Sequence, residues 1–184
     1  MLREAPSGFI TADLSIGVLF EQAIAACSKR HVCPPDEVLH RLETGDRRIH
    51  STFRYGVAKG LSAHLESLGP VFHGVYVYGS AIGDDSGPAS DIDLIVVVAT
   101  RCEQLTWFLK RLDLCLATAY RGLVRGGKEP ASLLDIRIIN LQEQDERTGA
   151  GPVLGGLHTR PICLWRSDPA ITGALRKEGP RRSL

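Results

Sequence analysis

Two aspartates separated by one apolar residue are the side chains of this sequence best suited to chemistry. Asp91 and Asp93 open the run Leu94–Val98, whose uninterrupted apolar composition predicts a central strand covered on both faces. Residues i and i+2 of a strand share a face, so we expect the two carboxylates about 7 Å apart, with Ile92 directed oppositely. Oxygen ligands of this kind suit a hard cation such as Mg²⁺, which also keeps waters and phosphate oxygens as ligands. The pair therefore predicts a metal–phosphate site.

A glycine–serine turn lies upstream of this pair. The segment Val71–Tyr78 has the pattern of a strand, and Gly79-Ser80 ends it. A lone Gly-Ser pair is an ordinary turn, but at this distance from Asp91 and Asp93 it is also a candidate phosphate site. Gly79 would let the backbone approach a phosphate closely, because it has no Cβ. Ser80, at the start of a helical turn, would offer a hydroxyl and a backbone N–H to phosphate oxygens. The following residues 81–90 are rich in Gly, Ser, Pro and Asp and predict a link of turns.

A third carboxylate occurs in a later apolar segment. Leu133–Asn140 predicts a strand in which Asp135 and Arg137 share one face. Burying a lone carboxylate among apolar residues is costly, so Asp135 needs a partner. Two interpretations follow: Asp135 completes the metal site, or it forms a structural ion pair with Arg137. By contrast, Asp84 and Asp85 in the link are interpreted as turn formers on a wet loop.

The order of strand, Gly79-Ser80, ten-residue link, Asp91-Ile92-Asp93-Leu94 and a later strand with one more Asp resembles the DNA polymerase β-type nucleotidyltransferase superfamily. Its small, minimal members are the nearest in shape, and the resemblance covers about Asp46–Asn140. It implies an Mg²⁺-dependent enzyme that transfers a nucleoside monophosphate from an NTP, expected to be ATP, to an acceptor hydroxyl and releases pyrophosphate. Such transfer needs positioning and charge neutralisation, which two metal ions supply. Asp91, Asp93 and Asp135 would hold both ions, and Gly79 and Ser80 the phosphates.

One departure from the family pattern concerns the phosphate side. Family members often carry Arg or Lys just after the Gly-Ser pair, whereas Ala81 and Ile82 stand here. Arg137, Lys128 and Arg125 are alternative sources of positive charge, or are surface charges. This departure supports a rival hypothesis, a catalytically silent nucleotide-binding or regulatory module of the antitoxin type.

The resemblance leaves the acceptor open among small molecules, a partner toxin protein and RNA. A formal net charge of +1 gives no support to a long nucleic-acid partner and makes RNA the less favoured acceptor. The chain has no large helical domain for acceptor binding, so we expect a homodimer or a helical partner subunit, using residues 10–45.

Several helices are expected to position these residues. A helix over Asp13–Lys29 with Asp13 as its N-cap precedes a short helix that begins at Pro35 and stops at Thr44-Gly45. This pair is interpreted as a packing or dimerising cap rather than a DNA-binding helix-turn-helix, because no basic recognition helix is present. A longer helix over Asp46–Leu68 has an apolar stripe. The stripe consists of Ile49, Phe53, Val57, Leu61, Leu65 and Leu68, and its solvated face carries Arg47, Arg48, Arg54 and Lys59.

The second half of the chain adds one long helix and one short strand. Thr100 and Glu103 form a predicted capping box for a helix that Gly126-Gly127 closes. Gln142–Gly156 predicts a loop with a turn of helix, and Pro161–Trp165 a short final strand. The expected fold class is α/β (α+β), a small mixed β-sheet flanked by helices. An N-terminal helical extension (1–45) precedes the nucleotidyltransferase-like domain (46–167), and a flexible basic tail (168–184) follows it.

Composition bounds the remaining choices. At 184 residues with 43% apolar side chains, the chain can build one domain with a real core. The five cysteines show no metal-binding spacing, and Cys102 and Cys115 are expected to be buried in a helix. We find no signal-peptide pattern and no run long enough to span a membrane, so a cytoplasmic location and no membrane partner are expected.

Overall fold

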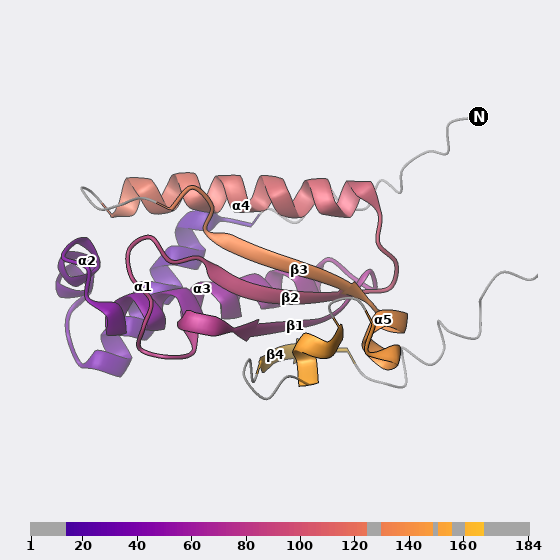
Figure 1. Ribbon diagram of the computed structural model, residues 1–184. Helices are drawn as coiled ribbons and strands as arrows, with labels where there is room; N and C mark the ends of the chain where they lie inside the picture. Colours follow the sequence, from indigo (N-terminus) through magenta and orange to yellow (C-terminus); the bar gives the residue numbers. More distant parts are fainter. Residues whose placement is uncertain (1–13, 125–129, 149–150, 156–160, 168–184) are drawn as a thin grey trace, which may run out of the picture.

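The computed structural model describes residues 14–124, 130–148, 151–155 and 161–167. A four-stranded sheet is flanked by helices (Figure 1). The helices are α1 (Ile16–His31), α2 (Pro35–Glu43), α3 (Arg47–Ser67), α4 (Glu103–Leu123) and α5 (Leu141–Glu146), with two 3₁₀ segments, η2 (Gly79–Ala81) and η3 (Gly151–Gly155). The strands are β1 (Phe72–Tyr78), β2 (Ile92–Val98), β3 (Leu134–Asn140) and β4 (Ile162–Arg166).

The sheet is mixed, in the order β3-β2-β1-β4. Strand β1 is antiparallel to both β2 and β4, whereas β2 and β3 run parallel and are joined by α4. The parallel pair needs such a crossover because a tight turn can join only antiparallel strands. The predicted mixed α/β fold and the central place of β2 are confirmed.

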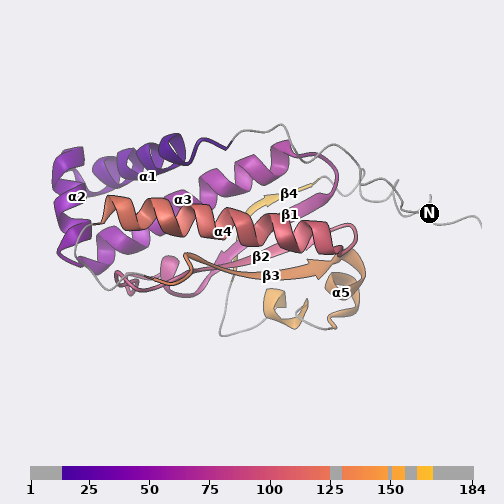
Figure 2. The same ribbon diagram turned by 90° about the horizontal axis from the view of Figure 1, so that it is seen from above.

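Two apolar layers lie on opposite faces of the sheet. One face packs against α1, α3 and α4, and α5 and η3 lie on the other (Figure 2). In β2, Ile92, Leu94 and Val96 belong to the large core under the helices, whereas Ile95 and Val97 belong to the smaller cluster. This alternation follows from the period of two in a strand. It fixes which side chains of β2 lie on the less covered face.

The N-terminal helices share the large core with the sheet. Residues of α1 and α2 such as Leu19 and Val38 are buried in the same cluster as the stripe of α3. Helices α1 and α3 approach closely, since a Cβ at Gly56 would lie 3.0 Å from the Cα of Ala23. Helix α1 begins after the N-cap Ser15, two residues later than predicted, and the predicted N-cap Asp13 lies outside the described residues.

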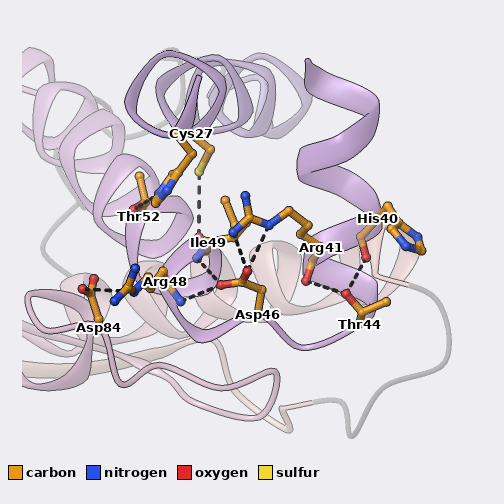
Figure 3. A network of polar contacts seen from close by, with 10 residues as sticks. Cys27, His40, Arg41, Thr44, Asp46, Arg48, Ile49, Thr52 and Asp84 are labelled. Atoms are coloured by element: carbon orange, nitrogen blue, oxygen red, sulfur yellow. Dashed lines mark hydrogen bonds and ion pairs between the residues drawn. The ribbon is translucent and has the colours of Figure 1, made fainter. Parts of the chain in front are cut away.

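Polar contacts join α1, α2 and the start of α3 (Figure 3). Asp46 is the N-cap of α3 and accepts hydrogen bonds from the backbone N–H groups of Arg48 and Ile49. The same carboxylate pairs with Arg41 of α2 at 2.6 Å from Nη2. The guanidinium and the two backbone donors hold the pKa of Asp46 below its usual range, against the effect of burial. Asp46 therefore fixes α2 against the first turn of α3.

Three predictions for α4 are wrong. Cys102 is its N-cap and its side chain accepts no capping bond within the described chain, so Glu103 is the first helical residue and no Thr100–Glu103 capping box forms. Helix α4 ends at Leu123, with Val124 as C-cap, before Gly126-Gly127, which lie outside the described residues. Cys102 and Cys115 are both exposed, because α4 lies at the surface and buries a narrow stripe only.

None of the described helices combines the length and the apolar character that crossing a membrane requires.

Candidate functional site

Asp93 and Asp135 lie opposite one another on the parallel strands β2 and β3. The two residues are partners in the register of the ladder. Their sequence neighbours Ile92 and Leu134 are buried in the large core, so alternation places both carboxylates on the opposite face of the sheet. Asp91 lies one residue before β2 and is exposed. The structure thus brings the second and third predicted carboxylates side by side at the start of their strands.

Gly79 lies directly against Asp93. Its φ is +70°, a left-handed conformation that favours glycine. A Cβ at this position would lie 2.0 Å from Asp93 Oδ2 and 2.9 Å from its Cγ. Gly79 opens the 3₁₀ segment η2 right after β1, and the last residue of β1, Tyr78, is the register partner of Asp93. The glycine therefore gives room to the Asp93 carboxylate, a contact that the sequence did not indicate.

The environment of Asp93 favours a proton or a cation. Burial, and then the negative charges of Asp91 and Asp135, raise the pKa of Asp93 to about 6, while Arg137 acts in the opposite direction. Two carboxylates that disfavour the ionisation of a third repel it, and a bound cation would offset this repulsion. The donor chemistry of the three aspartates thus fits Mg²⁺. Within the described part of the chain, however, no three His, Cys, Asp or Glu side chains are gathered closely enough to hold an ion by themselves.

Arg137 packs on the ring of Tyr78. Its guanidinium carbon lies 5.7 Å from the ring centroid, within the range of a cation–π contact. Burial raises the pKa of Tyr78, Arg137 lowers it, and the three aspartates raise it. The Tyr78 hydroxyl is buried and has no hydrogen-bond partner among the described residues. Tyr78 is a site residue that the sequence did not single out, because an aromatic residue at the end of a strand is ordinary.

The structural ion pair between Asp135 and Arg137 is absent from the described residues, where the ion pairs are Arg41–Asp46, Arg48–Asp84 and Arg101–Glu143. The other cations considered from the sequence, Arg125 and Lys128, lie outside the described residues. Arg137 is therefore the predicted cation that the structure places beside the carboxylates.

Three serines connect η2 with the link that follows it. Ser51 Oγ of α3 donates to the Ser80 carbonyl at 3.3 Å and accepts from the Ser86 N–H at 3.1 Å. The Ser86 hydroxyl donates to Ser80 Oγ at 3.1 Å. The side chain of Ser80 is thus held by a buried neighbour, and its position follows from α3. Ser51 and Ser86 had no distinguishing signal in the sequence.

An open hollow of about 460 Å³ lies farther along the link and is lined by Gly87, Pro88, Ala89 and Ser90. Asp91 is the next residue of the chain after this lining. Asp84 and Asp85 are exposed, as expected of turn formers, and Asp84 pairs with Arg48 at 3.8 Å (Figure 3).

Arg54 was predicted on the solvated face of α3, and this prediction is wrong. Its side chain is 0% exposed. The first turns of α3 are buried over a wide arc, because α1 and α2 cover one side while the link and α4 cover the other. A single apolar stripe in the sequence does not reveal such an enclosed helix segment.

Asp113 of α4 holds the beginning of β3. Its Oδ1 accepts from the backbone N–H groups of Leu133 and Leu134, both at 2.8 Å, and its Oδ2 accepts from the Ser132 hydroxyl at 2.7 Å. These bonds fix the chain one residue before Asp135. Asp113 was missed because nothing in a helical pattern distinguishes an aspartate that bonds to a distant loop.

Comparison of the chain with protein-family models, with curated proteins and with solved structures gives no match.

Proposed function

We propose that this chain is an Mg²⁺-dependent nucleotidyltransferase. It would transfer a nucleoside monophosphate from an NTP, with ATP expected, to a hydroxyl of a small molecule or a protein, and release pyrophosphate. The observation that carries the proposal is the register pairing of Asp93 with Asp135 beside Gly79. This arrangement gathers carboxylate charge at the end of the Gly79-Ser80 turn, where Mg²⁺ ions would offset it together with the negative charge of a triphosphate.

The residues of the site have separate roles in this proposal. Asp91, Asp93 and Asp135 would hold two Mg²⁺ ions, which when bound neutralise phosphate charge and acidify the acceptor hydroxyl. Ser80 and the backbone of η2 would bind phosphate oxygens. Asp135 would take the proton of the acceptor hydroxyl, whose oxygen forms the new bond to the α-phosphorus as the bond to pyrophosphate breaks.

A second candidate function is a nucleotide-binding or regulatory module that transfers nothing. Ala81 and Ile82 follow Ser80 where a cation would assist the triphosphate. Arg137 supports this second candidate as well, since its guanidinium is already engaged with the Tyr78 ring.

Calorimetric titration with Mg·ATP tests the proposal. The measurement belongs at about pH 8, where Asp93 with its pKa of about 6 is ionised. Asp91→Asn with Asp93→Asn should abolish metal-dependent binding, while Asp85→Asn, an exposed aspartate of the link, should leave it unchanged. ATP binding that is undetectable, or that persists without metal and in the double variant, would exclude the proposal.

A transfer assay separates the two candidate functions. The purified chain is incubated with labelled ATP, CTP, GTP or UTP in a cell lysate, and labelled molecules are identified. Metal-dependent label that disappears in the double variant supports the enzyme. Tight Mg·ATP binding with no labelled product from any of the four nucleotides supports the silent module.

A further inference from the structure

Arg54 is a buried cation that contacts two distant parts of the chain, the link and α4. Its Nε donates to the Ser90 carbonyl at 3.0 Å, and its Nη2 donates to the Pro88 carbonyl at 3.0 Å. Its Nη2 also lies 3.4 Å from the Tyr120 hydroxyl of α4, and its guanidinium carbon is 5.3 Å from that ring centroid. None of the ion pairs among the described residues includes Arg54. A buried charge without a carboxylate partner is costly, so its bonds must offset a substantial desolvation penalty.

His50 completes the contacts of Arg54 and connects them to α2. His50 Nε2 lies 3.0 Å from the Leu42 carbonyl, which can only accept, so Nε2 carries the proton. Nδ1 then carries the lone pair, and both Arg54 Nη1 and the Tyr120 hydroxyl lie 2.9 Å from it. Burial, and then Arg54, lower the pKa of His50 to about 4, so the ring is neutral at neutral pH. The end of α2 therefore contributes to holding the guanidinium in place.

The two carbonyls that Arg54 binds lie in the last residues of the link, just upstream of Asp91. Ser90 is the neighbour of Asp91, and Pro88 lies three residues before it. Burial lowers the pKa of Arg54, while Tyr120 and then the negative charge of Asp91 act against it. The other end of the link is held by the same turn of α3, through Ser51. Residues three apart in a helix share a face, which explains how one turn reaches both ends.

We infer that Arg54 is a positioning residue, which fixes residues 88–90 and thereby the place of Asp91 in the carboxylate site. This inference rests on the proposed function for its effect on Mg·ATP, but its structural part does not. A guanidinium is suited to the role because its planar fork donates in several fixed directions at once. An ammonium keeps the charge and loses the fork, so Arg54→Lys separates the two properties.

Hydrogen–deuterium exchange in Arg54→Lys tests the structural part. We expect the amides of residues 87–92 to exchange at least about tenfold faster than in the unaltered chain. The amides of residues 75–77 in β1 are the reference, because their exchange rate should change only as far as the free energy of global unfolding changes. Arg47→Lys, the same change at an exposed arginine of α3, should leave both segments unchanged. Exchange in 87–92 that is unaltered, or that rises only in step with 75–77, would overturn the inference.

Mg·ATP titration of the same variants tests the link to function. Arg54→Lys should bind about tenfold or more weakly, and Arg47→Lys like the unaltered chain. If the unaltered chain itself binds no Mg·ATP, the proposed function fails, whereas the exchange comparison still decides the role of Arg54. If the variant exchanges faster in 87–92 but binds Mg·ATP with unaltered affinity, the positioning role is refuted.

NMR of the arginine side chains in the unaltered chain covers the case in which Arg54→Lys does not fold. The guanidinium protons of Arg54 should exchange with water much more slowly than those of Arg47, because four acceptors hold them in a buried position. Equal exchange rates for the two residues would contradict the inference.

Discussion

The Asp93 carboxylate occupies the space that a side chain at Gly79 would need, since a Cβ on the glycine would lie 2.0 Å from the carboxylate oxygen Oδ2. A turn that was expected to admit a phosphate thus also leaves room for the Asp93 carboxylate. The contact makes the glycine a requirement of the site, and not only of the turn.

Gly79→Ala should displace the Asp93 carboxylate. We expect a stability loss of roughly 1–3 kcal/mol from the positive φ and the collision, and Mg·ATP binding weakened about tenfold or more. Gly69→Ala is the matched control, since Gly69 has φ +96° and no described atom within 4 Å of an added Cβ. Urea unfolding and calorimetry of both variants compare them. Equal effects on Mg·ATP binding would show that the contact with Asp93 is irrelevant to the site.

Asp93→Asn should change how stability depends on pH. The pKa of Asp93 is about 6 in the folded chain and near 3.8 without the fold, so the folded state binds more protons between these values. Asp93 therefore supports stability below pH 4 and loses that contribution as pH rises through 6. Relative to the unaltered chain, the variant should be about 1–2 kcal/mol more stable at pH 7 and similar at pH 3.5. Urea unfolding at both pH values measures this difference, and a constant difference would contradict it.

Asp135→Asn should separate binding from turnover. Since Asp91 and Asp93 remain, Mg·ATP affinity should fall by no more than about threefold, whereas transfer to the acceptor should fall by at least about 100-fold. Calorimetry and the labelled-nucleotide assay measure the two quantities, with Asp85→Asn as the control. Loss of folding in circular dichroism would instead assign Asp135 a structural role.

Asp113→Asn should destabilise the beginning of β3. The amide cannot accept all three of the hydrogen bonds that the carboxylate takes from Ser132, Leu133 and Leu134. The expected loss is about 1–3 kcal/mol in the free energy of unfolding, measured in urea. The exposed Asp85→Asn should lose less than about 0.5 kcal/mol. Similar small losses in both variants would show that these bonds do not hold the strand.

The sequence predicted those elements whose signal is local. The stripe of α3 repeats at three or four residues, and the run from Leu94 is apolar throughout, so a long helix and a central strand followed directly. Pro35 marked the start of α2, and this signal is also local, because the fixed φ of proline suits a first helical turn. The predicted start of α4 was wrong, since a Thr100–Glu103 spacing alone does not show which residue is the N-cap.

By itself, the sequence determined that Asp91 and Asp93 open a buried strand after a Gly-Ser turn, because alternation along a strand is a property of consecutive residues. Only the tertiary structure decided that Asp135 is the register partner of Asp93 and that Gly79 adjoins it. It also decided that Arg54 is buried under the link. Register between strands and the burial of a polar residue depend on segments far apart in the chain, whose contacts no local pattern records.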